Sequence, residues 1–414
     1  MPTPRFLLIA QPNSYRIAPY IKACTALGIE CRIASRGEHS LISEVASGLH
    51  IELDDHDAAL QAILNDAAHR PCAGVLGSDD STVELAARAA RSLGLPHNPP
   101  AAAQATRRKD LARSQLARAG CPVPAHRVLD LGQSLPMQLR GVRYPCVIKP
   151  VHLSASRGVM RCDNEAELLT AAERLLPILA GSGDAFESSH ALLEDYIDGI
   201  EVAFEGYLHH GRLHTLALFD KPDPLTGPCF EETIYVTPSQ LDAATQQRIT
   251  RRVQQACDAF ALHTGPVHAE LRINEQDAWI LEVASRTIGG DCARTLDSGN
   301  GLSLEQLTIQ LAMGQQPQVE SPEGASGVMM LPIPKAGILK RVEGLLQAQR
   351  VPYVEKVEMV IPNGHELVPL PEGNQYPGYI FARAPTAPQV VDALRQAHAE
   401  LHFEITPLWK IHAA

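Results

Sequence analysis

The first hundred residues alternate between short apolar runs and segments with a helical spacing of apolar positions. Arg5–Ala10 and Glu30–Ala34 are runs of strand length, and Ile17–Leu27 between them has helical spacing. This order predicts two parallel strands joined by a right-handed helical crossover. A helix near residues 57–67 and a strand at 73–76 continue the alternation. We therefore expect an open α/β domain at the N-terminus.

A second helix is expected over residues 81–93, with Ser78 or Asp79 as its N-cap. Three prolines between residues 96 and 100 then mark a boundary. Beyond them, the segment Ala101–Ala119 is rich in Ala, Arg and Leu, which predicts one continuous helix that ends at Gly120.

The middle of the chain contains both segments with helical spacing and segments with the patterns typical of strands. Strands are expected at 144–149 and 191–194, and a helix at 165–179. Alternating polar and apolar positions at 201–208 and 213–219 indicate two antiparallel strands. A mixed arrangement of this kind predicts an α+β domain in the centre.

The last third begins with a long amphipathic helix. We expect it over Ala243–His263, capped by Thr237–Ser239. Ser321–Gly327 is the expected linker to a mixed tail. Taken together, the pattern predicts an α/β and α+β multidomain protein.

Composition narrows the function. The 414 residues contain 36 Lys and Arg against 47 Asp and Glu, a net charge of −11, which argues against nucleic-acid or membrane partners. No apolar run approaches the roughly 20 residues that cross a bilayer, and the first residues do not resemble a signal peptide. The nine cysteines are scattered singly along the sequence, so a reducing cytoplasm is expected.

A pair of strands around a polar turn, residues 268–283, carries the first chemical signal. If the hairpin is symmetric about Gln276, Glu270 and Glu282 lie opposite each other on one face. Two facing carboxylates favour a cation between them, and Mg²⁺ that bridges substrate phosphates fits such oxygen ligands. The alternative, an exposed hairpin whose acids pair with nearby arginines, stays open.

Two further segments are weaker signals. Lys149 ends a strand and is followed by a small-residue loop, Ser154–Gly158, so a cation and backbone N–H groups lie where phosphate oxygens would bind. The extended segment from Glu194 to Ile197 offers backbone groups to a flat base, and Glu201 follows where vicinal hydroxyls would lie. A surface lysine and an ordinary strand end are the alternatives.

Taken jointly, these segments resemble the ATP-grasp superfamily. The resemblance covers residues 95–315, and the first hundred residues resemble the pre-ATP-grasp domain that precedes this fold. It rests on the order and spacing of Lys109, Lys149, the Ser154–Gly158 loop, the Glu194–Glu201 segment, Glu270, Glu282 and Arg286. The implied domains are a pre-ATP-grasp domain at 1–98, a linker helix and lid at 99–192, a catalytic subdomain at 193–320 and a C-terminal α+β domain at 321–414.

The resemblance implies a role for each of these residues. Arg286 and Lys149 are the expected catalytic residues, with Arg286 facing the transferred phosphoryl group. Glu270 and Glu282 are the expected ligands of Mg²⁺, with Mn²⁺ as an alternative ion. The expected ATP contacts are Lys109, Lys149, Ser154, Ser156 and Gly158 at the phosphates, Glu194, Tyr196 and Ile197 at adenine, and Glu201 at the ribose.

One departure from the superfamily pattern selects a branch. Many relatives carry Asn where this chain has Ala284, so a second metal site is expected to be looser. The resulting Glu-x-Ala-x-Arg ending resembles the branch of the L-amino acid ligases. Ser285 is not expected to replace the missing ligand, because its side chain should lie on the opposite face of the strand from Glu282.

Three nearby features carry further expectations. Lys221 and Glu232 flank a proline-rich loop and are candidates for substrate contacts, although a stiffened surface loop is slightly favoured. Gly289 and Gly290 are either an ordinary turn or an approach to an acyl phosphate. His268 shares a face with Glu270 and is expected to orient that carboxylate.

The expected function is that of an ATP-dependent carboxylate–amine ligase. It would phosphorylate a small carboxylic acid and join it to an amine, with at least one amino acid among the substrates. The alternatives are a carboxylase or formate-activating relative, or a nucleotide-binding module without turnover. Dimers are common among similar proteins, so a homodimer is one expected assembly.

Overall fold

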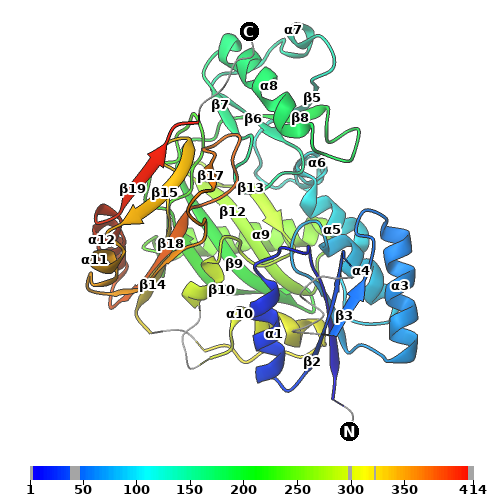
Figure 1. Ribbon diagram of the computed structural model, residues 1–414. Coiled ribbons are helices and arrows are strands. Elements are labelled where there is room, and N and C mark those ends of the chain that lie inside the picture. The colour runs from blue at the N-terminus through cyan, green and yellow to red at the C-terminus, as the bar shows by residue number, and fades with distance from the viewer. Residues whose placement is uncertain (1–2, 38–46, 297–300, 321–322, 409–414) are drawn as a thin grey trace.

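The computed structural model describes residues 3–37, 47–296, 301–320 and 323–408 (Figure 1). Within these ranges the strands form four sheets. No helix in the described part of the chain is both long and apolar enough to cross a membrane.

The N-terminal part is a four-stranded parallel sheet in the order β3-β2-β1-β4, as the alternating pattern predicts. Its strands are β1 (Arg5–Ile9), β2 (Glu30–Ser35), β3 (Ser47–His50) and β4 (Gly74–Gly77), and its helices are α1 (Ile17–Ala26), α3 (His56–His69) and α4 (Val83–Ser92). The predicted cap of α4 is wrong. Thr82 is the N-cap and makes no side-chain cap bond, while Asp79 accepts from the Ser81 N–H in the turn before the helix.

The helix expected over Ala101–Ala119 is two helices, α5 (Pro100–Arg107) and α6 (Lys109–Arg118). The break is at Arg108, whose backbone is extended. The Lys109 N–H donates to the carbonyl of Val151 at 2.7 Å instead of continuing α5. This break brings the start of α6, and with it Lys109, beside the strand that ends at Pro150.

A separate antiparallel sheet in the order β5-β8-β6-β7 lies at the top of Figure 1. Its elements are β5 (His126–Asp130), α7 (Leu135–Gln138), β6 (Cys146–Pro150), β7 (Met160–Cys162), α8 (Glu165–Leu179) and β8 (His190–Asp195). Leu168, Leu175 and Leu179 of α8 pack on the buried face of this sheet. We call this unit the lid subdomain.

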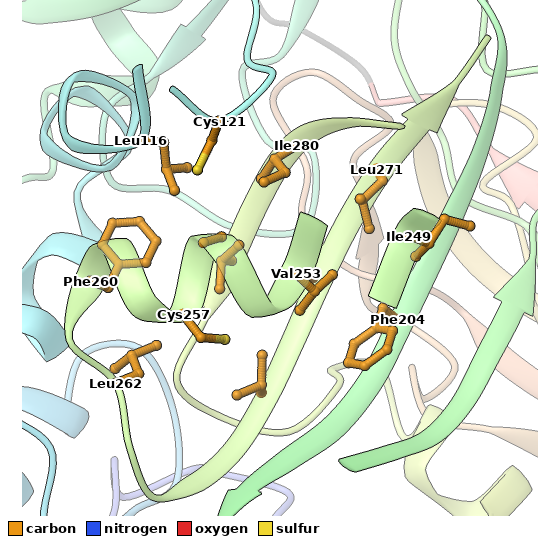
Figure 2. Close-up of a cluster of buried hydrophobic side chains, with 14 of the residues drawn as sticks. Leu116, Cys121, Phe204, Ile249, Val253, Cys257, Phe260, Leu262, Leu271 and Ile280 are labelled. Carbon is orange, nitrogen blue, oxygen red and sulfur yellow. The ribbon is translucent and has the colours of Figure 1, made fainter. Parts of the chain in front are cut away.

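An eight-stranded sheet forms the centre of the molecule, in the order β13-β12-β9-β10-β11-β14-β18-β16. Its strands are β9 (Ile200–His209), β10 (Arg212–Asp220), β11 (Ile234–Thr237), β12 (Gly265–Ile273), β13 (Ala278–Ala284), β14 (Ala325–Met330), β16 (Val354–Met359) and β18 (Gly378–Ala384). Helix α9 (Ala243–Phe260) packs Val253 and Cys257 against this sheet (Figure 2). Its predicted cap is also wrong, because the Asp242 carboxylate, not Thr237–Ser239, accepts from the Thr245 N–H.

The C-terminal part joins the central sheet instead of standing apart, since β14 pairs with β11 on one side and β18 on the other. Residues 325–327 of the expected linker therefore belong to β14, and residues 321–322 lie outside the described ranges. A three-stranded sheet, β17-β15-β19, and two helices complete this part. Their bounds are β15 (Gly337–Glu343), α11 (Leu345–Gln349), β17 (Glu366–Leu367), α12 (Ala387–Ala399) and β19 (His402–Thr406).

The segment before β14 returns to the N-terminal domain. It contains a 3-10 turn, η1 (Cys292–Leu296), and the helix α10 (Leu304–Ala312). Ile309 and Ala312 of α10 share a buried cluster with Phe6 and Leu8 of β1. The N-terminal domain is thereby fixed against the central sheet, and residues from both line one site.

Candidate active site

Two adjoining cavities lie where the lid subdomain, the central sheet and the N-terminal domain meet. The first cavity is lined by Lys109, Lys149, Ser154, Ser156, Glu194, Tyr196, Ile197, Glu201, Glu270, Glu282 and Arg286, among others. They include every nucleotide, metal and catalytic residue that the resemblance implies except Gly158, whereas Lys221, a candidate for substrate contact, lines neither cavity. The second cavity has a volume of about 750 Å³ and shares Glu232, Glu270 and Arg286 with the first.

Lys149 and Glu194 form a buried ion pair on adjacent strands of the lid subdomain, with 2.5 Å between Nζ and Oε2. Arg113, from α6, donates its Nε to the other oxygen of Glu194 at 2.5 Å. Burial raises the pKa of Glu194, but the charges of Arg113 and Lys149 outweigh it and bring the pKa to about 2. The Glu194 carboxylate is therefore ionised.

Arg113 was not among the expected site residues. Its two terminal nitrogens donate to the carbonyls of Ile280 and Leu281 on β13, both at 2.8 Å. One buried guanidinium thus connects the lid subdomain, α6 and the central sheet. This role is not evident from the sequence, because Arg113 stands within an ordinary helical pattern and its partners are far away along the chain.

Glu270 and Glu282 are cross-strand partners, as the hairpin argument predicts. The hairpin is not symmetric as expected, however. Leu271 pairs with Ile280, which leaves Leu281 as an extra residue, a β-bulge, in β13. The turn is not centred on Gln276, and the extra residue of the bulge is what brings Glu282 opposite Glu270. Both carboxylates remain partly exposed to the first cavity, at 24% each.

Glu282 has a cation partner already: Lys109 Nζ lies 3.0 Å from its Oε2 and also donates to the carbonyl of Leu153. The arginine pairing considered as the alternative is absent here, since Arg272 pairs with Glu201 and Arg286 pairs with Asp80. The acids of this hairpin face a cavity instead of bulk solvent.

A second carboxylate cluster surrounds Lys221. The Nζ of Lys221 lies 2.8 Å from Glu201, 2.5 Å from Glu232 and 3.5 Å from Glu270. One oxygen from each acid lies within 4.8 Å of the others. Burial lowers the pKa of Lys221, but the three acids hold it well above its usual value. The favoured interpretation as a proline-stiffened surface loop holds for Pro222, Pro224 and Pro228, which are exposed, but not for Lys221, whose side chain is 3% exposed.

His268 lies beside Glu270, as expected from the alternation. Its Nδ1 is 3.1 Å from the buried carboxylate of Glu205, and its Nε2 is 3.8 Å from Glu270. Burial lowers the pKa of His268, but the hydrogen bond to Glu205 and the nearby charge of Glu270 outweigh it and raise the pKa to about 9. A protonated imidazole therefore lies beside Glu270, and its role in orienting that carboxylate stays a prediction.

Arg286 lines both cavities and is held by the N-terminal domain. Its Nε donates to Asp80 Oδ1 at 2.8 Å, and its Nη1 donates to the carbonyl of Thr287. Burial raises the pKa of Asp80, but the charge of Arg286 outweighs it, so the pKa stays below its usual value. Asp80 was not identified as a site residue from the sequence, since 206 residues separate it from Arg286.

The loop Ser154–Gly158 has an unusual backbone. Ala155, Ser156 and Gly158 all have positive φ values, of 56°, 53° and 75°. A Cβ on Gly158 would lie 2.7 Å from Leu175 Cδ1 and 2.8 Å from Pro150 Cγ, so only glycine fits. Gly158 does not line the first cavity; it lets the loop pack on the lid subdomain while Ser154 and Ser156 face the cavity.

Gly289 and Gly290 line the second cavity, so an approach to a ligand by this turn remains a prediction. The hydroxyls of Ser285 and of Thr106 on α5 share a hydrogen bond of 3.0 Å. Ser285 lines neither of the two cavities. Ser285 therefore lies on the other side of the strand from Glu282, as predicted.

Comparison with known families agrees with this geometry. Residues 142–295 match the ATP-grasp domain, residues 21–97 match the ATP-grasp N-terminal domain, and residues 329–406 match the L-amino acid ligase C-terminal domain 2. The chain belongs to the ATP-grasp superfamily.

Solved structures with the ATP-grasp fold support this placement. The L-amino acid ligase of Bacillus licheniformis superimposes with a TM-score of 0.85 at 24% identity, covering 98% of this chain and all of that one. Phosphoribosylglycinamide synthetase from Anaerococcus prevotii gives 0.69 at 14% identity, covering 98% of this chain and all of that one. At these identities the comparison establishes the fold alone.

Among ATP-grasp relatives by sequence, alanine–anticapsin ligase from Bacillus subtilis is 25% identical over 294 residues, covering 66% of this chain and 61% of that protein. An uncharacterised protein, y4rH from Sinorhizobium fredii, is 25% identical over 341 residues, covering 82% of this chain and 70% of its own. The match thus spans less than two thirds of the named ligase.

Proposed function

We propose that this protein is an ATP-dependent ligase that joins a small carboxylic acid to an amine through an acyl phosphate, releasing ADP and phosphate. The observation that carries the proposal is the convergence of three cations, Lys109, Lys149 and Arg286, with two opposed carboxylates, Glu270 and Glu282, on one cavity. The ligases named among the relatives support the same reaction class.

ATP would bind in the first cavity. Its phosphates carry several negative charges, which match Lys109, Lys149 and the N–H groups of the Ser154–Gly158 loop. The same cavity is also lined by Tyr196 and Ile197, which suit the adenine ring. Glu194 would lie at adenine and Glu201 at the ribose.

The donor set fits a hard divalent cation. Glu270 and Glu282 present oxygen atoms from opposed positions on two strands, and both are open to the cavity. Mg²⁺ usually takes only one or two protein carboxylates together with substrate phosphates and water, and Mn²⁺ accepts the same oxygen ligands. When bound, such an ion neutralises phosphate charge as the phosphoryl group moves. His268 would hold Glu270 in place for this role.

The chemistry of the residues then follows from charge. An oxygen of the acid attacks the γ-phosphorus of ATP, and the bond from that phosphorus to the bridging oxygen of ADP breaks. The amine next attacks the acyl carbon, phosphate leaves, and the amine gives up a proton. Arg286 lies at the junction of both cavities, where its fixed charge would stabilise the phosphoryl group in each step.

The volume of the second cavity limits the size of the acid and the amine. Its volume of about 750 Å³ lies in the range that suits small molecules rather than polymers. Relatives carry the names alanine–anticapsin ligase, carnosine synthase 1 and dapdiamide A synthase. We therefore expect an amino acid as at least one substrate and no nucleic-acid or membrane partner.

The test is phosphate release with ATP and Mg²⁺ across pools of amino acids and small acids, followed by mass spectrometry. A pool-dependent signal with a new amide mass is the expected result, and Lys149→Met should abolish it. A response to bicarbonate or formate alone would identify a carboxylase or formate-activating enzyme instead. Tight nucleotide binding without ADP formation in every pool would indicate a binding module, and both outcomes would refute the ligase.

A further inference from the structure

The Ser154–Gly158 loop is held from outside the lid subdomain. The Gly158 N–H donates to the carbonyl of Pro371 at 2.8 Å, and the Arg157 Nε donates to the carbonyl of Glu372 at 2.9 Å. Both acceptors belong to the C-terminal part, more than 200 residues further along the chain. The loop that faces the first cavity is thus bonded by its backbone and by one side chain to another domain.

A third contact fixes the acceptor segment to the lid subdomain. Arg174 on α8 donates to both carboxylate oxygens of Glu372, with Nε–Oε1 at 2.5 Å and Nη2–Oε2 at 2.9 Å. The two side chains are 49% and 41% exposed, and an exposed pair adds little to stability. A bidentate pair does fix orientation, however, and this one involves the same residue whose carbonyl accepts from Arg157.

The acceptor segment is itself rigid. The Gly373 N–H donates to the carbonyl of Pro369 at 2.9 Å, and a Cβ at Gly373 would lie only 1.7 Å from the carbonyl oxygen of Val368. Pro371 is buried. A tight turn therefore presents the two carbonyls at a defined position.

The same segment continues into the wall of the second cavity, where Asn374, Gln375 and Tyr376 are lining residues. Six consecutive residues, 371–376, thus contact the loop at the first cavity and the space proposed for the acid and the amine. We call residues 371–376 the bridge.

We propose that the bridge is a positioning segment for the Ser154–Gly158 loop, with Glu372 as its key side chain. The inference rests on the proposed function for the identity of the nucleotide, but not for the contact itself. The C-terminal part would then set how the loop covers the phosphates of ATP as well as enclosing the second cavity. Loosening the bridge should weaken nucleotide binding and raise the KM for ATP more than it lowers kcat.

Two variants and a matched control test this in the full-length protein. Glu372→Ala and Arg174→Gln each remove the bidentate pair, while Glu343→Ala removes an exposed glutamate whose partner Arg341 lies away from the loop. Hydrogen exchange read by mass spectrometry reports on the Gly158 N–H without requiring turnover. Calorimetry with the analogue AMP-PNP and MgCl₂ gives the nucleotide Kd.

We expect Glu372→Ala and Arg174→Gln to speed exchange in the peptide 154–159 and to raise the Kd for AMP-PNP about fivefold, with no change in Glu343→Ala. The charge-swapped double variant Arg174→Glu, Glu372→Arg should restore most of both. Exchange and Kd within twofold of wild type in both single variants would overturn the proposal, as would an equal effect in Glu343→Ala. If the wild type binds no AMP-PNP, the proposed function fails, and the exchange data still decide the role of the bridge.

Discussion

Removing the charge of Arg113 is the most direct test of how the site is held together. Its guanidinium is 2% exposed and donates to Glu194 and to two carbonyls on β13. Arg113→Met keeps most of the side-chain volume and removes every donor. The substitution leaves the Glu194 carboxylate with Lys149 as its remaining cation and deprives the carbonyls of Ile280 and Leu281 of their donors.

The expected magnitude follows from those losses. Breaking a buried ion pair by removing one partner costs about 3–5 kcal/mol. The retained Lys149 lessens this cost, while each buried carbonyl left without a donor adds about 1–3 kcal/mol. We therefore expect the free energy of unfolding to fall by about 3–5 kcal/mol at pH 7. Arg118→Met, at an exposed position on the same helix, should change it by less than about 0.5 kcal/mol.

Urea unfolding followed by tryptophan fluorescence measures the change in the free energy of unfolding near Arg113, because Trp279 lies on β13 beside Ile280. A Trp409→Phe background leaves Trp279 as the sole tryptophan. A local probe is needed because a chain of several domains need not unfold in one step.

The pH dependence has a defined sign. The pKa of Glu194, about 2 in the folded protein, lies below its unfolded value of about 4.3. Its stabilisation is therefore present above about pH 4.3 and is lost as the pH falls towards 2. In Arg113→Met the ionised Glu194 has one cation fewer, so its protonation removes less stabilisation. The difference in the free energy of unfolding between wild type and Arg113→Met should therefore decrease as the pH falls over this range. A gap below about 1 kcal/mol at pH 7, or one that does not change with pH, would refute the reasoning.

Four further outcomes are expected. Glu282→Ala should keep the fold, by circular dichroism, and lose at least about a hundredfold in ATP turnover, because one carboxylate remains to hold the ion. Glu201→Ala should raise the KM for ATP more than it lowers kcat, and an unchanged KM would contradict the ribose assignment. Lys221→Met should gain thermal stability as the pH falls from 8 to 5, since the loss of the cation raises the pKa of Glu232 above the value of about 7 that it has beside Lys221. In EDTA, Glu282→Gln should bind AMP-PNP about three- to tenfold more tightly than wild type by calorimetry.

The sequence predicts the local parts of this site well. Lys149 at a strand end and the opposed Glu270 and Glu282 follow from patterns within a few residues, and the structure has both. The pairing of Glu270 with Glu282, however, does not arise for the reason that predicted it. The register depends on the extra residue at Leu281, which alternation alone does not indicate.

The residues that hold the site together could not be found this way. Arg113 and Asp80 act on partners 81 and 206 residues away, and such contacts depend on how domains pack. The burial of Lys221 was missed for another reason. A charged residue beside prolines suggests a surface loop, and only the packing of β9, β12 and the segment before β11 supplies the acids that make the burial of Lys221 tolerable.

The paired charges explain why removing a carboxylate should tighten nucleotide binding in EDTA. Lys109 is held by Glu282, so in the absence of a divalent cation it must leave a carboxylate before it can contact a phosphate. Glu282→Gln removes that competing charge and frees Lys109. With magnesium present, the order should reverse, because Glu282 is then needed as a ligand and wild type should bind more tightly. If Glu282→Gln binds AMP-PNP more weakly than wild type in both conditions, Glu282 does not restrain Lys109, and the pairing seen here has no part in binding.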